Sequence, residues 1–224
     1  REEQDMFAIN SHRKAFLNYH KLEEEITPVY CTHDNCIRSF NNIVVDTDNG
    51  PRESTMSALE RLRPLFDRNE GTVTAGNSSQ ITDGACALLL MTEKGLTETG
   101  CVPIGRIMNY AYTGCDPSRM GLGPVSAVEK LTSNSAFKLE DMDLVEINEA
   151  FATQVLACQK YLNISEDKLN VNGGAIALGH PVGASGARLV LTLLKELNRQ
   201  KLKNGLATLC VGGGQGGAIW LETC

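Results

Sequence analysis

The chain has 224 residues, of which 42% are hydrophobic and 21% are charged, and its formal net charge is −6. This composition is that of an ordinary globular protein, and the length allows one large domain or two small ones. The negative charge argues against sequence-independent nucleic-acid binding, and no apolar run approaches the roughly 20 residues of a membrane helix.

The first 84 residues predict helices joined by loops. Residues 1–23 carry apolar side chains at roughly helical spacing, whereas 26–53 predict loops with short strands. Ser54 or Thr55 is placed to cap a short helix that ends near Pro64, and a loop of small residues follows. Because the chain opens on Arg, in a helical pattern with no capping residue, we expect a piece of a longer protein.

From Asp83 onward, strand and helix patterns alternate. The apolar run ACALLLM predicts a strand buried on both faces, and the next short helix should end at Gly100. The further predicted elements are a strand at 102–113, a helix at 126–137, a strand at 144–147, a helix at 151–162, a helix after His180, and two closing strands, GLATLCV and AIWLE, joined by GGGQGG. This order predicts a layered α/β fold with helices on both faces of a sheet.

Two short motifs suggest familiar sites without completing them. The string Gly212-x-Gly214-x-x-Gly217 precedes a strand rather than a helix, so we interpret it as a hairpin and not as a dinucleotide site. Cys31-x-His33-x-x-Cys36 supplies half of a zinc site, but no second ligand pair follows it. We therefore predict no metal. The eight scattered cysteines favour free thiols in a reducing compartment.

His180 lies in the glycine-rich stretch NGGAIALGHPVGASGAR. A buried structural histidine is the default interpretation, with a phosphate loop, a metal ligand and a catalytic base as alternatives. The predicted helix start just after Pro181 disfavours an imidazolium and leaves a neutral ring that accepts a proton. The glycines on both sides leave space for another backbone or a ligand.

Two further residues lie at predicted strand ends, where α/β sheets bind ligands. Asn148 follows the strand LVEI and is either a ligand-binding side chain, a helix cap, or both. Cys210 lies near the end of the strand LATLCV, next to glycines whose N–H groups could form an oxyanion hole. A small core thiol is the default interpretation of Cys210.

Several segments, in order, resemble the thiolase family: GTVTAGNSSQITDGACALLLM, GCDPSRMGLGPVSA, EINEAFATQ, NGGAIALGHPVGASGAR and LATLCVGGGQGGA. GCDPSRMGLGPV in particular resembles degradative 3-ketoacyl-CoA thiolases, including β subunits of bacterial fatty-acid oxidation complexes. The resemblance implies an acyl-CoA C-acyltransferase that cleaves 3-ketoacyl-CoA with coenzyme A or runs the reverse condensation. Coenzyme A would be a substrate, and no cofactor is implied.

The resemblance also implies roles for individual residues. His180 would activate a nucleophilic cysteine and form an oxyanion hole with a water held by Asn148. Cys210 would exchange a proton with the acetyl α-carbon, and the N–H of Gly212 would serve a second oxyanion hole. The residues implied to line the coenzyme A arm and the acyl pocket are Ala75, Ser79, Ala150, Phe151 and Met120.

The resemblance implies one mixed-sheet half of a five-layer αβαβα sandwich, with 1–82 as a partial coenzyme-covering loop region and 83–224 as the C-terminal half-domain. The family's nucleophilic cysteine lies in a segment like C-A-S-G, which this sequence lacks. We therefore expect no activity without an N-terminal half, and we expect the helix at 184–199 to be the layer exposed by its absence.

The implied partners are acyl-CoA, coenzyme A, the N-terminal half and further copies in a homodimer or tetramer. A hydratase/dehydrogenase subunit stays open as another partner, and a cytoplasmic location is expected, with a mitochondrial one as the alternative. The alternative function is a non-catalytic acyl-CoA or lipid-binding protein of the same fold. The intact trio of His180, Asn148 and Cys210 argues against it, because a binder needs no acid/base groups.

Overall fold

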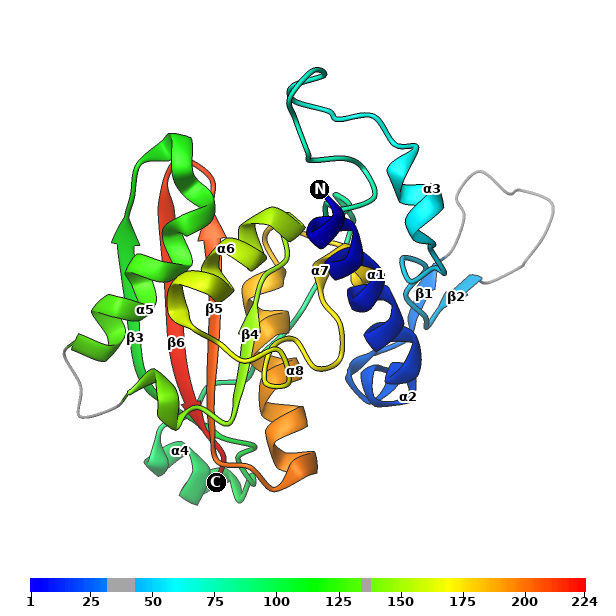
Figure 1. Ribbon diagram of the computed structural model, residues 1–224. Helices are drawn as coiled ribbons and strands as arrows, with labels where there is room; N and C mark the ends of the chain where they lie inside the picture. Colours follow the sequence, from blue (N-terminus) through cyan, green and yellow to red (C-terminus); the bar gives the residue numbers. More distant parts are fainter. Residues whose placement is uncertain (32–42, 134–137) are drawn as a thin grey trace.

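The computed structural model describes residues 1–31, 43–133 and 138–224. Its centre is a four-stranded mixed sheet in the order β3-β6-β5-β4 (Figure 1). These strands are β3 (Arg106–Gly114), β4 (Leu144–Ile147), β5 (Asn204–Val211) and β6 (Gln215–Glu222). Only β4 and β5 run parallel, and a single parallel bridge from Val145 to Leu169 extends the sheet beyond β4.

Helices cover both faces of the sheet. α5 (Gly123–Ser133) and α6 (Ala152–Leu162) share one apolar core with the sheet, and α8 (Ser185–Gln200) forms a second core with the other face. Successive residues of a strand point to opposite faces, so Leu206 belongs to the first core and Ala207 to the second. The predicted α/β layering is confirmed.

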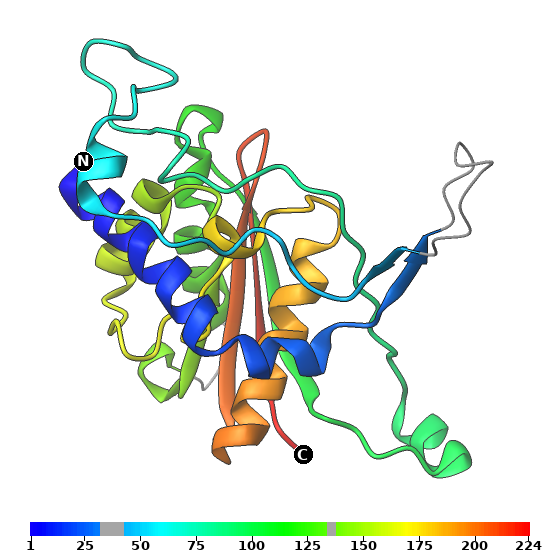
Figure 2. The same ribbon diagram turned by 90° about the vertical axis from the view of Figure 1, so that its right-hand side faces the viewer.

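The N-terminal elements lie beside this sheet rather than in it, with α1 on the side of β4 and α8 (Figures 1 and 2). They are α1 (Glu2–Leu17), α2 (Tyr19–Leu22), the 3₁₀ turn η1 (Glu23–Glu25), the antiparallel pair β1 (Val29–Cys31) and β2 (Ile43–Val45), α3 (Met56–Glu60) and α4 (Glu93–Thr99). The remaining short elements are η2 (Pro117–Leu122), η3 (Leu139–Asp141) and α7 (Ala175–Leu178).

Most predicted elements are confirmed within a few residues. Thr55 caps α3 by accepting a hydrogen bond from the Ala58 N–H at 3.3 Å, and α4 ends at Gly100 in the left-handed conformation, φ 66°. The predicted first helix is broken at Asn18. The glycine string between β5 and β6 is a hairpin, as predicted.

Two predictions about apolar segments are wrong. Residues 85–91 form no strand, and their leucines Leu89 and Leu90 are 81% and 71% exposed. An extended segment pairs only where a free strand edge meets it, and this segment instead leads away from the sheet toward α4 (Figure 2). Within the described part of α8, no large apolar side chain is exposed, so the helix at 184–199 is not the uncovered layer.

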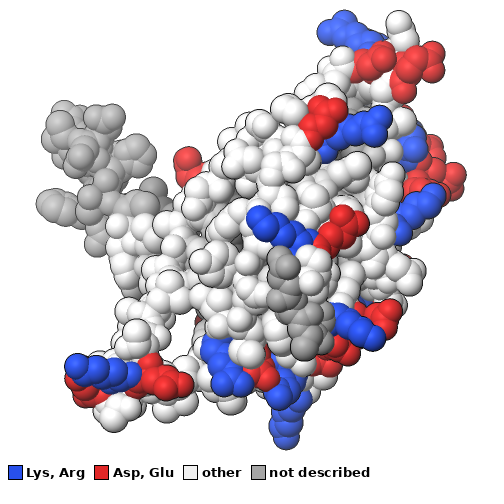
Figure 3. Space-filling model, turned by 90° about the vertical axis from the view of Figure 1, so that its left-hand side faces the viewer, with Lys and Arg blue, Asp and Glu red and all other residues white. Residues whose placement is uncertain are grey.

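Several exposed apolar side chains lie along the edge strand β3. On this strand Ile107, Met108, Tyr110 and Tyr112 are between 38% and 70% exposed. Figure 3, which views the molecule from the side of β3 and α5, shows a largely uncharged surface with charged side chains scattered mainly around its margins. No helix of the described residues is long and apolar enough to cross a membrane.

Candidate active site

The backbone around His180 is fixed by close approaches that require glycine. A Cβ on Gly174 would lie 2.3 Å from the carboxyl carbon of Glu149. Gly179 has φ +96°, and a Cβ there would lie 2.6 Å from the Thr82 side chain. The His180 N–H then donates to the Gln80 carbonyl at 2.8 Å. The glycines therefore admit neighbouring segments, as the sequence predicts.

Both ring nitrogens of His180 have partners. Nε2 lies 3.1 Å from Asn148 Nδ2, and Nδ1 lies 2.6 Å from the Oγ of Ser185, the first residue of α8. Burial of the ring lowers the pKa of His180, and the charge of Arg188 lowers it further. The neutral imidazole predicted from the sequence is thus favoured, with burial as the first cause.

Asn148 links this loop to the sheet. Its side chain is fully buried, and its backbone N–H donates to the Thr208 carbonyl at 3.0 Å, which continues the parallel pairing of β4 with β5. Its Oδ1 is buried without a hydrogen-bond partner among the described residues. The helix-cap interpretation is wrong, because α6 begins after Phe151 and has no side-chain cap.

Cys210 lies two residues beyond Thr208 on β5, at the same sheet end as Asn148. Its side chain is buried, and burial raises the pKa of the thiol, with a smaller increase from neighbouring Cys115. The turn that follows is open: a Cβ on Gly212 or Gly213 would meet no described residue within 4 Å. A thiol that keeps its proton therefore lies beside a freely approached backbone turn.

Four of the five residues implied for coenzyme A lie along one pair of segments. The Ser79 N–H donates to the Ala150 carbonyl at 3.0 Å, and Ser78 forms an antiparallel bridge with Phe151. Ala75 lies in the turn that begins this segment. Met120 lies on η2, which packs against α6 through Gly121 and Gln154.

A cavity of about 420 Å³ lies along the loop that follows His180. It lies between residues 82–86 and the start of α8 at 181–184, and Thr82 Oγ1 beside it is buried without a partner among the described residues. In the described ranges no group of three or more His, Cys, Asp or Glu side chains could hold a metal ion. The side chains of Cys31, His33 and Cys36 lie outside the described residues.

Sequence reasoning missed three residues in and around the site, Ser185, Arg188 and Glu146. Ser185, the first residue of α8, follows His180 by five residues and bonds its ring. Arg188 lies 3.5 Å from buried Glu146. Burial raises the pKa of Glu146 to about 8, while Arg188 opposes the increase. No spacing rule in the sequence would have paired these residues.

Family models match nearly the whole chain. The thiolase C-terminal domain matches residues 101–223, and the thiolase N-terminal domain matches residues 1–94. The chain belongs to the thiolase family. The division that these matches give, between 94 and 101, differs from the predicted boundary after residue 82, which stays a prediction.

Thiolase-family relatives are longer than this chain. An acetyl-CoA acetyltransferase of Chromobacterium violaceum is 48% identical over 225 residues, which cover 99% of this chain and 56% of that protein. The crystal structure of the Bacillus anthracis acetyl-CoA acetyltransferase superposes with a TM-score of 0.94 at 41% identity, over 100% of this chain and 56% of that one. For the crystal structure of human mitochondrial 3-ketoacyl-CoA thiolase the TM-score is 0.89 at 38% identity, and the match covers 100% of this chain and 55% of that one. The chain thus spans about half the length of these relatives.

Proposed function

We propose that this chain carries the acid/base part of an acyl-CoA C-acyltransferase, which cleaves 3-ketoacyl-CoA with coenzyme A or forms it in reverse. The observation that carries the proposal is the hydrogen bond between Asn148 and His180 at the sheet end where buried Cys210 adjoins an open turn. The two titratable groups have pKa values pushed in opposite directions, which is typical of paired acid and base roles.

In the proposed cleavage, a cysteine from a portion of the protein outside these 224 residues attacks the C3 ketone after giving its proton to His180. The C2–C3 bond breaks, and its electrons pass to the acetyl-CoA enolate. Cys210 gives its proton to C2, which completes acetyl-CoA. Coenzyme A then attacks the acyl-enzyme while the Cys210 thiolate takes the proton of the incoming thiol. The shortened acyl-CoA leaves, and the departing cysteine thiolate regains its proton from His180.

The polar groups at the site suit the charges that this reaction develops. Asn148 Oδ1 is a buried acceptor with no partner among the described residues, and it would hold a water whose hydrogen points at the substrate oxygen, beside His180. The N–H of Gly212, on the open turn, would serve the acyl-enzyme oxygen. The pantetheine arm would lie along the paired segments of Ser79 and Ala150, with Ala75, Phe151 and Met120 around it.

Several finer features belong to the same proposal. The motif GCDPSRMGLGPV favours a degradative role in fatty-acid oxidation, although two of the relatives named above are acetyl-CoA acetyltransferases. We propose that the chain acts only when joined to the remainder of the fold, in a homodimer or tetramer, with a hydratase/dehydrogenase subunit as a further candidate partner. A cytoplasmic location is proposed, with a mitochondrial one as the alternative.

The test joins this chain to the portion of the Chromobacterium violaceum relative that it does not match, and it measures thiolysis of acetoacetyl-CoA. His180→Ala should lower turnover by about 10²–10⁴-fold because it removes the base. His20→Ala, at an exposed histidine, is the matched control. Near-normal turnover in His180→Ala would overturn the assignment.

Cys210→Ser separates the two half-reactions in the same chimera. Exchange of the acetyl-CoA methyl protons should be nearly abolished, while acylation of the nucleophilic cysteine is partly retained. Exposed Cys101→Ser is the control. Equal loss of both steps would mean that Cys210 is structural, and a folded chimera that binds coenzyme A without thiolysis would favour the non-catalytic acyl-CoA-binding alternative.

A further inference from the structure

The hydroxyl of Ser185 occupies a defined place between the ring of His180 and the start of α8. Its Oγ lies 2.6 Å from His180 Nδ1 and 3.1 Å from the carbonyl oxygen of Pro181. The side chain is 1% exposed, so water cannot readily substitute for either partner. Nothing in the proposed reaction uses this hydroxyl directly.

The Ser185 backbone holds the hydroxyl in place. The Ser185 N–H donates to the Pro181 carbonyl at 3.0 Å, and the neighbouring Ala184 N–H donates to the same oxygen at 2.8 Å. These bonds lie at the N-terminal end of α8, a helix of 16 residues. The Oγ position is therefore set by a rigid helix start and not by a loose side chain.

A hydroxyl has one hydrogen to donate and two lone pairs that accept. When the Ser185 hydrogen points to the Pro181 oxygen, a lone pair faces His180 Nδ1, which must then carry the ring hydrogen. In a neutral imidazole the other nitrogen, Nε2, is then unprotonated. The reverse arrangement has Ser185 donating to Nδ1 and places the ring hydrogen on Nε2.

The surroundings of Asn148 favour the first arrangement. An unprotonated Nε2 accepts from Asn148 Nδ2, which leaves one amide hydrogen and the carbonyl Oδ1 to be satisfied. A protonated Nε2 would need the amide turned over, with Oδ1 accepting and both amide hydrogens left unpaired in a fully buried site. Orphaned buried N–H groups are rarer than under-satisfied carbonyl oxygens.

We propose that Ser185 is a positioning residue that holds His180 in the tautomer protonated at Nδ1, so that Nε2 is the proton acceptor facing Asn148. This inference rests on the proposed role of His180 as a base. It assigns Ser185 no contact with substrate. Its action is to fix which nitrogen accepts the proton and how the ring is oriented.

The tautomer is read directly from long-range ¹H–¹⁵N spectra of the 224-residue chain labelled at histidine, at pH 8 where the imidazole is neutral. The four histidines are assigned by single substitutions, with His180→Gln for the ring in question. We expect a protonated Nδ1 and an unprotonated Nε2. Magic-angle-spinning spectra give the same readout if the chain self-associates.

Variants of Ser185 complete the test. Ser185→Ala should shift His180 toward the Nε2-protonated tautomer, and Ser185→Thr, which keeps the hydroxyl, should restore the wild-type pattern. Ser126→Ala is the matched control, because Ser126 donates to the Gly123 carbonyl at the start of α5, far along the chain from His180. A wild-type Nε2–H tautomer, or a Ser185→Ala spectrum identical to wild type, would overturn the proposal.

Kinetics in the chimera separate this proposal from the proposed function. Ser185→Ala should lower kcat by about 10- to 100-fold with little change in KM, less than the loss of the base itself. If the tautomer is as expected but His180→Ala retains turnover, the proposed function fails and the positioning contact stands. If His180→Ala is inactive but Ser185→Ala changes neither tautomer nor kcat, the positioning role fails alone.

Discussion

Two segments of the first 94 residues contradict what their composition suggests. α1 is rich in charged and polar side chains, yet it buries Asp5, Ser11 and His12 against the rest of the molecule. The stretch 85–91 is wholly apolar, yet Leu89 and Leu90 are exposed. Hydrophobicity alone would predict that 85–91 is buried and that the polar residues of α1 are exposed.

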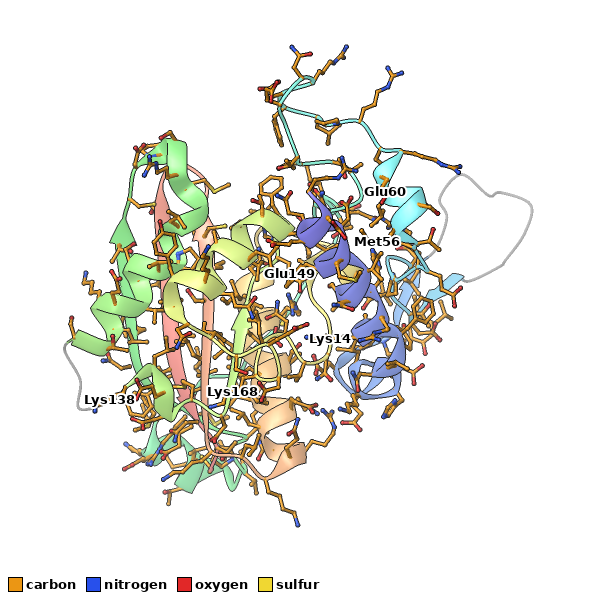
Figure 4. The ribbon with its side chains drawn as sticks, viewed as in Figure 1. Lys14, Met56, Glu60, Lys138, Glu149 and Lys168 are labelled. Carbon is orange, nitrogen blue, oxygen red and sulfur yellow. The ribbon has the colours of Figure 1, made fainter. Side chains whose placement is uncertain are left out.

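The difference lies in what each segment meets. Ser11 Oγ donates to Glu149 at 2.6 Å, and Lys14 Nζ donates to the Leu169 carbonyl at 2.9 Å (Figure 4). Polar contacts therefore hold α1 against the segments next to β4. No strand of the described residues pairs with 85–91. Burial in this chain therefore follows the partners that are present, and buried polar groups persist where each is hydrogen-bonded.

The largest loss of stability should come from replacing Glu149, the carboxylate that bonds Ser11 of α1. The Glu149 carboxyl group accepts hydrogen bonds from Ser11 Oγ, Asn170 Nδ2 and the Ile176 N–H, and it is 1% exposed. Glu149→Ala should lower the free energy of unfolding by about 3–5 kcal/mol, since hydrogen bonds to charged groups contribute about 1.5–3 kcal/mol each. Urea denaturation measures the change.

Glu166→Ala, at an exposed carboxylate, is the control and should change stability by less than about 0.5 kcal/mol. Equal effects of the two substitutions would mean that the polar anchors of α1 contribute nothing. The comparison between α1 and 85–91 would then need another explanation.

A second, smaller effect concerns the pH dependence of α1. Burial lowers the pKa of His12 from 6.5 to about 4, with a further decrease from Arg52. The unfolded chain binds the proton more tightly, so this contribution to stability is complete above pH 6.5 and is lost as the pH falls toward 4. The lowered pKa of His12 can change the free energy of unfolding by at most about 3 kcal/mol over this range.

The measurement is the difference in unfolding free energy between wild type and His12→Gln at pH 4, 5, 6 and 7. The difference should grow in favour of wild type with rising pH, whereas exposed His20→Gln should give a flat difference. Using a difference matters because Glu146, with its pKa raised to about 8, acts in the opposite direction over an overlapping range. A flat difference for His12 would show that its ring is not held neutral by the fold.

The sheet half was predictable from sequence because its signals are local. The glycine after α4, the apolar run of β5 and the apolar face of α8 each specify an element without reference to distant residues. His180, Asn148 and Cys210 were found because they lie at strand ends or in glycine-rich turns. The sequence did not predict the hydrogen bond between His180 and Asn148. That contact depends on the parallel pairing of β4 with β5 and on the loop that brings His180 to the end of β4.

The remainder depended on contacts between distant residues. Ser11 and Glu149 are 138 positions apart, and no local sequence pattern around either residue predicts their hydrogen bond. Residues 85–91 have a genuine strand pattern, but strand formation reflects packing and pairing more than intrinsic preference. The role of Ser185 depends on the loop that brings the His180 ring back to the start of α8, which no local pattern around Ser185 predicts.

The smallest change in stability should come from 85–91, where the informative readout is association. Leu89→Glu with Leu90→Glu should alter the free energy of unfolding by no more than about 0.5 kcal/mol, because both side chains are already exposed. We expect the wild-type chain to self-associate through this uncharged run, which contains neither proline nor a gatekeeper charge. Light scattering should show smaller particles for the double variant, whereas Tyr161→Glu, at an isolated exposed aromatic residue, should leave them unchanged. If the double variant unfolds more readily than wild type, 85–91 is packed in solution, and the contrast with α1 disappears.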